Sequence, residues 1–118
     1  MRLKTDLFQT YLRHYADKNL AAISDMLAAE VHLRDWNISV RGHAAAVRET
    51  AQNFAEADSL EIRVLALYEN ADTVAGELHI IVNKTIELYV VDVITFDAQG
   101  KITAIRSYKG RGDENVQI

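Results

Sequence analysis

The second half of the sequence alternates between strand-like segments and very short polar breaks, and this pattern limits the fold more than any other feature. Residues 60–69, 73–82, 85–96 and 101–109 are rich in Val, Ile, Leu, Tyr and Thr, and two to four residues separate them. Connections this short join antiparallel neighbours, because a parallel crossover takes about a dozen residues or more. This half of the chain therefore predicts a four-stranded antiparallel meander.

The first half is mainly helical in pattern. Apolar residues recur at three- and four-residue spacing in one stripe, formed by Leu7, Phe8, Tyr11, Leu12 and Tyr15. Asn19 is a suitable N-cap for a short second helix. Residues 31–36 change to a period of two, and residues 41–56 return to a helical pattern. We therefore expect one α+β domain over residues 1–110, with helices on one face of a curved, mostly antiparallel sheet, and a polar tail at 111–118.

Composition excludes several classes of function. The net charge is −4 with scattered Lys and Arg, which argues against a nucleic-acid partner. No apolar run approaches the roughly 18–20 residues that span a bilayer, and no leader is recognisable, so we expect neither membrane insertion nor secretion. Cysteine is absent, which rules out disulfides, thiolate catalysis and thiolate metal sites. A cytoplasmic protein is the resulting expectation.

One acid lies on the apolar side of the third strand of this meander. Every second residue from 86 to 96 shares a face, namely Ile86, Leu88, Val90, Asp92, Ile94 and Phe96. Asp35 similarly shares its side of the 31–36 strand with Val31 and Leu33, and Tyr11 lies in the helical stripe. A buried carboxylate is costly unless it is hydrogen-bonded, paired or protonated. Asp92 could cap backbone amides, pair with Arg106, or lie at a wet end of the sheet, but two acids and a phenol converging on an apolar space favour a functional site.

The register of the 73–82 and 85–96 strands decides what else faces Asp92. If Asn83 and Lys84 close a two-residue hairpin, Glu77 and His79 share the face of Asp92. A slip of one residue would replace them by a set that contains Val74, Gly76, Leu78 and Ile80.

These residues resemble the motifs of a known superfamily. Tyr11 in FQTYL, the segment NLAAISDMLAAEVHLRD that leads to Asp35, and Asp92 in VVDVITFDAQGKI are similar to the nuclear transport factor 2-like superfamily, in particular to its ketosteroid isomerase and SnoaL-like branch. The resemblance covers about residues 4–110 and implies the cone-shaped α+β barrel of that superfamily. It also implies that Tyr11 and a protonated Asp92 donate hydrogen bonds to an oxyanion while Asp35 is the general base.

The resemblance also suggests which side chains would contact a substrate. Trp36 follows the base where the isomerases usually have Pro, and Leu27 and Thr50 occupy positions of supporting tyrosines. We expect Trp36, Leu27, Glu77, His79, Val90 and Ile105 to contact a small hydrophobic substrate.

The sequence leaves the activity open between three hypotheses. The first is proton transfer next to a carbonyl, without a metal or organic cofactor. The second is another reaction of the same fold, such as a SnoaL-like cyclisation or epoxide opening, which would need Arg106 between Asp35 and Asp92. The third is a ligand-binding or dimeric interaction module without turnover. The four histidines lack zinc-ligand spacing, Ser107 lacks a visible His–Asp partnership, and no phosphate-binding glycine loop is present.

A homodimer is expected through the other face of the sheet. The assumed alternation assigns to that face a large apolar set, formed by Leu78, Ile80, Val82, Tyr89, Val91 and Val93. The family resemblance implies pairing through the same face.

Overall fold

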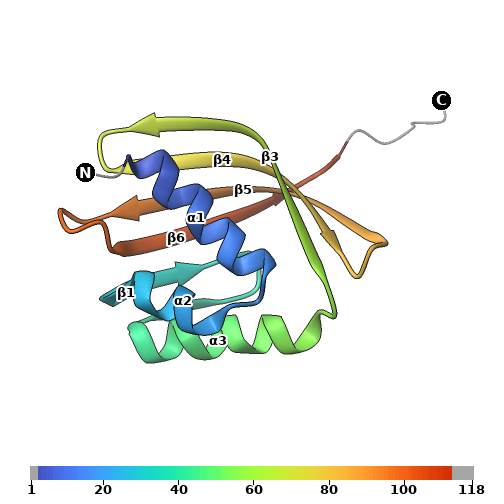
Figure 1. Cartoon of the computed structure of the whole chain (residues 1–118), viewed down its shortest axis with the longest axis horizontal. Coiled ribbons are helices and arrows are strands. Elements are labelled where there is room, and N and C mark those ends of the chain that lie inside the picture. The colour runs from blue at the N-terminus through green and yellow to red at the C-terminus, as the bar shows by residue number, and fades with distance from the viewer. Residues whose placement is uncertain (1–2, 113–118) are drawn as a thin grey trace.

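Three helices cover one face of a curved six-stranded sheet in the computed structural model, which describes residues 3–112 (Figure 1). The elements, in chain order, are α1 (Lys4–Ala16), α2 (Leu20–Met26), β1 (Leu27–Arg34), β2 (Ser39–Arg41), α3 (His43–Glu56), β3 (Leu60–Asn70), β4 (Thr73–Val82), β5 (Ile86–Phe96) and β6 (Ile102–Gly110). The strand order is β2-β1-β6-β5-β4-β3. Most of the predicted polar tail, residues 113–118, lies outside the described part of the chain.

The predicted meander is confirmed, and β1 completes the sheet beside it. Strands β3 to β6 are successive antiparallel neighbours, whereas β1 runs parallel to β6 and antiparallel to β2. None of the helices within residues 3–112 is both long and apolar enough to cross a bilayer.

The helix boundaries follow the local sequence. Asn19 caps α2 as predicted, because its side-chain Oδ1 accepts a hydrogen bond from the backbone N–H of Ala22 at 3.2 Å. The strand expected at 31–36 begins earlier, at Leu27, because α2 ends at Met26 and passes directly into extended backbone.

The hairpin between β4 and β5 differs from the prediction by one residue. Its loop has three residues, Asn83 to Thr85, with Asn83 and Lys84 in the left-handed region at φ values of 54° and 67°. Asn83 is held by distant backbone, since its N–H donates to the carbonyl of Ser59 and its Oδ1 accepts from the N–H groups of Asp58 and Ser59. These contacts fix a longer loop and shift every pair along the two strands.

This shift moves Glu77 and His79 to the face of the sheet away from the helices, here called the outer face. Gly76, not Ala75 or Glu77, lies beside Asp92. Glu77 accepts a hydrogen bond from the Tyr68 hydroxyl at 3.0 Å. The prediction that Glu77 and His79 face Asp92 is therefore wrong, and the alternative register is confirmed.

The same shift corrects the apolar set expected on the outer face. Leu78 belongs to the buried core, and Ile80 packs against it, so these β4 residues face the helices. Val82 has the same parity along β4. Only Tyr89, Val91 and Val93 of the expected set remain on the outer face.

One close contact places α1 on the sheet. Phe8 is fully buried, and its ring covers Gly76 so closely that a Cβ there would lie 2.5 Å from the ring. Only glycine leaves room for this contact at the middle of β4. Because Phe8 fixes this turn of α1, Tyr11 is positioned one turn later over the same part of the sheet.

Candidate functional site

A small cavity lies between α1, α3 and the inner face of the sheet. Its volume is about 90 Å³, and its walls combine apolar side chains with a few polar ones. The lining residues are Tyr11, Leu12, Tyr15, Leu33, Asp35, Thr50, Asn53, Ile62, Ile80, Asp92, Ile105 and Ser107. The three residues that the sequence singled out, Tyr11, Asp35 and Asp92, therefore share one cavity.

Asp92 occupies the inner face of β5, between Gly76 on β4 and Ser107 on β6. It is 8% exposed, and its Oδ1 accepts a hydrogen bond from the Ser107 hydroxyl at 2.6 Å. Burial raises the pKa of Asp92 to about 6, the Ser107 hydrogen bond opposes that rise, and the charge of Asp35 adds to it. Asp92 therefore keeps its proton to a higher pH than an ordinary aspartate does.

Arg106 does not pair with Asp92. It is next to Ser107 in β6 and therefore points to the outer face, where its guanidinium donates to Thr95 Oγ1 at 3.3 Å. The ion pair between Arg106 and Asp92 that the sequence suggested is therefore not formed. Arg106 also does not lie between Asp35 and Asp92.

The Tyr11 hydroxyl borders the cavity, and no side chain among the described residues engages it. Tyr11 is 4% exposed, and its hydroxyl makes no hydrogen bond with any residue between positions 3 and 112. Its pKa is raised well above 10 by burial, by Tyr15 and by Asp92, so the phenol stays protonated. A protonated phenol facing a cavity is available to donate a hydrogen bond to a ligand.

Asp35 follows the last residue of β1 and begins a tight turn. Its Oδ1 accepts hydrogen bonds from the N–H groups of Asn37 and Ile38 at 2.7 and 2.9 Å, while its own N–H donates to the carbonyl of Ile38. Both hydrogen bonds to the Asp35 side chain use Oδ1. The turn therefore fixes the orientation of the carboxylate, and Oδ2 takes no part in the turn.

Four polar residues of the cavity, Tyr15, Thr50, Asn53 and Ser107, were not among the predicted site residues. Asn53 Nδ2 donates to the Tyr15 hydroxyl at 3.1 Å, and the Tyr15 ring lies 5.9 Å from the Tyr11 ring, centroid to centroid. Burial raises the pKa of Tyr15 to about 12, against the effect of the Asn53 hydrogen bond. Tyr15 had a usable signal, because it is four residues after Tyr11 in the same stripe. Asn53 had none, since it is exposed on a different helix.

Of the six residues expected to contact a substrate, only Ile105 lines the cavity. Leu27 and Val90 are buried in packing elsewhere, at 6% and 4% exposure. Trp36 is 45% exposed, with the ammonium of Lys109 over its ring at 6.0 Å, because the Asp35 turn directs it outward. Glu77 and His79 lie on the outer face, as described above.

The described part of the chain holds no group of three His, Cys, Asp or Glu side chains arranged to bind a metal ion. The chemistry that the cavity itself offers is that of two carboxyl groups, two protonated phenols, the hydroxyl groups of Thr50 and Ser107, and an amide. Such a set suits proton transfer and hydrogen bonding to a small polar group in an otherwise apolar space.

Comparisons with known structures give the same fold. An NTF2-like protein of unknown function from Cytophaga hutchinsonii matches with a TM-score of 0.78 and 14% identity, over 93% of this chain and 92% of that one. The epoxide hydrolase/cyclase-like enzyme SalBIII, which acts in pyran ring formation in salinomycin, matches with a TM-score of 0.78 and 21% identity, over 91% and 90%. A candidate ketosteroid isomerase from Kribbella flavida matches with a TM-score of 0.80 and 15% identity, over 97% and 82%.

Sequence comparison identifies the family. No curated protein matches the sequence significantly. The family model of the SnoaL-like domain, however, matches residues 8–105, which is most of the chain. The resemblance drawn from the Tyr11, Asp35 and Asp92 motifs is confirmed at this level, and the chain belongs to the SnoaL-like domain family.

Proposed function

We propose that this protein is an isomerase that moves a proton next to the carbonyl group of a small apolar substrate, without a cofactor. One observation carries the proposal: the Tyr11 hydroxyl, which has no partner among residues 3–112, shares a cavity of about 90 Å³ with Asp92, Asp35 and apolar walls. The unpartnered phenol and a carboxyl group of raised pKa are two donors suited to one ligand oxygen.

In this mechanism Asp35 removes a proton from the carbon next to the carbonyl. The electrons of that C–H bond form an enolate, whose negative charge lies on the carbonyl oxygen. Tyr11 and protonated Asp92 donate hydrogen bonds to this oxygen, and Asp35 then returns the proton at another carbon, so that no atom is gained or lost. Donors of this kind each change the rate by about 10²- to 10³-fold. Ketosteroid isomerases, which the sequence resembles, use a neutral acid in the same way.

Ser107 has a positioning role in the proposal. Its hydroxyl donates to Asp92 Oδ1 at 2.6 Å, so a proton on the neutral acid belongs on Oδ2, the oxygen that Ser107 does not engage. The acid is thereby oriented as a donor to a ligand.

The cavity size limits the substrate. Pockets for drug-sized ligands are typically about 300–1,000 Å³, and this cavity of about 90 Å³ is much smaller. A ketone with one ring fits this space better than a steroid does.

Epoxide opening by water is the second candidate, in a form that does without an arginine between Asp35 and Asp92, since Arg106 lies on the outer face. The hydrogen-bonded pair of Tyr15 and Asn53 beside Asp35 favours it, because these groups would orient a water molecule toward the cavity. Asp35 would take a proton from this water as its oxygen bonds to an epoxide carbon, and Asp92 would protonate the oxygen released by C–O cleavage. The epoxide hydrolase/cyclase-like neighbour supports this candidate at the level of fold.

A direct test is the isomerisation of cyclohex-3-en-1-one to its conjugated isomer, followed by absorbance. We expect Asp35→Asn to lower kcat by about 10²- to 10⁴-fold and Tyr11→Phe by about 10²- to 10³-fold. Glu56→Gln, on the exposed end of α3, serves as the control that leaves the rate unchanged. Equal rates for wild type and Asp35→Asn would refute the isomerase. Hydrolysis of cyclohexene oxide by the wild type but not by Asp35→Asn would favour the second candidate.

A further inference from the structure

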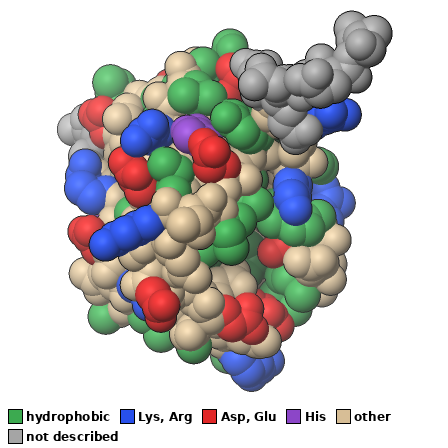
Figure 2. Space-filling view, turned by 90° about the vertical axis from the view of Figure 1, so that its right-hand side faces the viewer, with side chains coloured by type: hydrophobic (Ala, Val, Ile, Leu, Met, Phe, Trp, Pro, Cys, Tyr) green, Lys and Arg blue, Asp and Glu red, His purple; other side chains and the backbone are tan. Residues whose placement is uncertain are grey.

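Helices α1 and α3 cover different strands of the sheet and leave its middle between them. α1 packs mainly on β3 and β4, whereas α3 packs on β1 and β2. The inner face of β5 and β6, which carries Asp92 and Ser107, therefore lies beneath the gap between the two helices. Figure 2 looks at the side where both helices end and shows a recess with apolar side chains in it. Side chains of α1 and α3 determine how this gap is closed.

Each of these helices contributes two cavity residues one turn apart, one deep and one near the opening. On α1, Tyr15 follows Tyr11 by four residues, and on α3, Asn53 follows Thr50 by three. Tyr11 and Thr50 are both 4% exposed. Tyr15 is half-buried, and Asn53 is the one exposed residue among the described residues that line the cavity. The cavity therefore opens to solvent beside Asn53.

A hydrogen bond joins the two residues nearest the opening. Asn53 Nδ2 donates to the Tyr15 hydroxyl at 3.1 Å, so this contact spans the gap from α3 to α1. The Tyr15 ring is held in place, because the buried Phe54 meets it edge-on with the ring centroids 4.9 Å apart. Beyond it the Lys18 ammonium donates to the carbonyl of Ala57 at 2.5 Å, which ties the two helix ends together. The Tyr15 side of the opening is therefore fixed.

The Asn53 side chain is the part of the opening that can move. It is exposed, and among residues 3–112 it has no hydrogen bond other than the one to Tyr15. A single hydrogen bond of this kind shifts an equilibrium by only about two- to tenfold, because bonds to water replace it when it breaks. Asn53 can therefore turn outward to admit a ligand and turn back to close over it.

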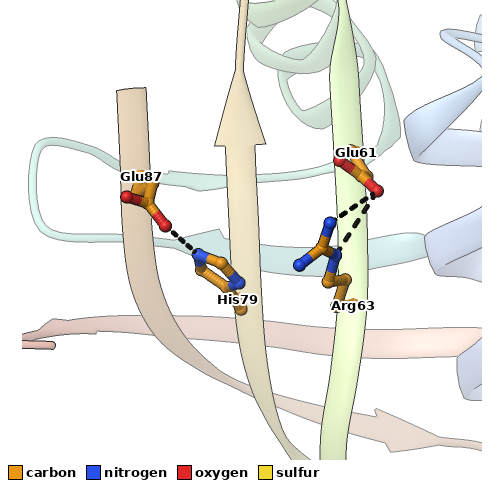
Figure 3. Close-up of polar contacts among 4 residues, drawn as sticks. All are labelled: Glu61, Arg63, His79 and Glu87. Atoms are coloured by element: carbon orange, nitrogen blue, oxygen red, sulfur yellow. Dashed lines mark hydrogen bonds and ion pairs between the residues drawn. The ribbon is translucent and has the colours of Figure 1, made fainter. Parts of the chain in front are cut away.

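The charge of the cavity favours neutral ligands. Two of its described lining residues are acids, and none is Lys, Arg or His. Cations of the neighbouring strands lie on the outer face, where Figure 3 shows Arg63 bound to Glu61 and His79 bound to Glu87. A carboxylate or phosphate group on a substrate would find no cation in the cavity, so size is the property left for the opening to select.

We propose that Asn53 and Tyr15 form a gate over the cavity, and that this gate sets the largest ring system that the site admits. The inference rests on the proposed function, in which the cavity is the ligand site, and it narrows the substrate class to uncharged ketones with one ring. With Asn53 bound to Tyr15 the cavity has a volume of about 90 Å³. A second fused ring would keep Asn53 displaced and the gate open.

The affinities for a one-ring and a two-ring phenol test the gate without any turnover. The dissociation constants of 4-cyanophenol and 6-cyano-2-naphthol are measured by calorimetric titration. We expect the wild type to bind the one-ring compound more tightly. Asn53→Ala removes the moving side chain and should reduce this preference by about three- to tenfold. Tyr15→Phe keeps the ring, removes the hydrogen-bond acceptor and should reduce the preference by a similar factor.

Gln52→Ala is the matched control, because it removes an amide from the adjacent exposed position of α3 and should change the preference by less than about twofold. Circular dichroism verifies the fold of each variant. An unchanged preference in Asn53→Ala, or an equal change in Gln52→Ala, would overturn the gate. A changed preference in Asn53→Ala but not in Tyr15→Phe would refute the hydrogen bond as the contact that closes it.

The wild type alone supplies two further contradictory outcomes. Binding of the two-ring phenol as tightly as the one-ring phenol, or no binding of either compound by any of the proteins, would overturn the proposal. The proposed reaction is tested separately: a protein that fails to isomerise cyclohex-3-en-1-one but shows the expected change in Asn53→Ala would refute the isomerase and support the gate.

Discussion

Replacing Asp92 by Asn should stabilise the protein at alkaline pH and leave its stability unchanged in acid. The carboxyl group has a pKa of about 6 in the folded protein against 3.8 for an unperturbed aspartate, with burial as the main cause. The folded state therefore holds the proton more tightly than the unfolded chain does. Its stability falls as the pH rises from about 4 to about 6 and then stays level with respect to this group.

The magnitude follows from the two pKa values. Their difference corresponds to about 3 kcal/mol, since each unit is worth about 1.4 kcal/mol. Asn has nearly the same shape, carries no charge, and its Oδ1 still accepts the hydrogen bond from Ser107. The variant should therefore gain up to about 3 kcal/mol over the wild type at pH 8 and nearly nothing at pH 4.

Urea denaturation followed by circular dichroism at pH 4, 6 and 8 measures this difference. Asp58→Asn makes the same chemical change at an exposed position and should shift stability by less than about 0.5 kcal/mol at each pH. An advantage of Asp92→Asn that is equal at pH 4 and pH 8, or a loss of stability at pH 8, would show that the carboxyl group is not held in a dry site.

Three other substitutions test separate parts of the account. Ser107→Ala removes the hydrogen-bond donor that lowers the pKa of Asp92, so this pKa should rise. The alkaline limb of the pH–rate profile should then move to higher pH, and an unchanged limb would contradict the role of Ser107. Gly76→Ala places a methyl group against the fully buried ring of Phe8 and should cost about 1–3 kcal/mol in urea denaturation, whereas an unaltered midpoint would mean that α1 moves freely over β4. Asn83→Ala removes the acceptor of two backbone N–H groups and should cost about 1–3 kcal/mol, with a neutral result refuting the explanation of the hairpin register.

The sequence was sufficient for the order of the elements, apart from the short strand β2, and for the meeting of Tyr11, Asp35 and Asp92 in one cavity. Alternation alone placed Asp92 on the buried side of β5, because the other five residues of its alternating series are apolar. A change in pairing with a neighbouring strand does not alter which residues of β5 share this side. The stripe of α1 placed Tyr11 on the same side of the sheet. Both inferences depend on the spacing of apolar residues within one strand or one helix, which the local sequence determines.

The register of β4 against β5 was not predictable in this way. It depends on hydrogen bonds from Asn83 to residues 58 and 59, more than twenty positions away in the chain. A two-residue and a three-residue loop were both compatible with the local sequence, so Glu77 and His79 were assigned to the wrong face. The place of Asn53 in the cavity could not be predicted for the same reason, because its hydrogen bond to Tyr15 forms only once α3 has packed beside α1.

The central claim is that Tyr11 and Asp92 offer hydrogen bonds to one ligand oxygen inside a small dry cavity. Calorimetric titration of a one-ring phenol such as 4-cyanophenol tests it most directly, because the phenolate resembles the proposed enolate in charge and shape. We expect the wild type to bind, Tyr11→Phe to bind about ten- to a hundredfold more weakly, and Glu56→Gln to match the wild type. Equal affinity of wild type and Tyr11→Phe, or no binding by the wild type, would contradict the account.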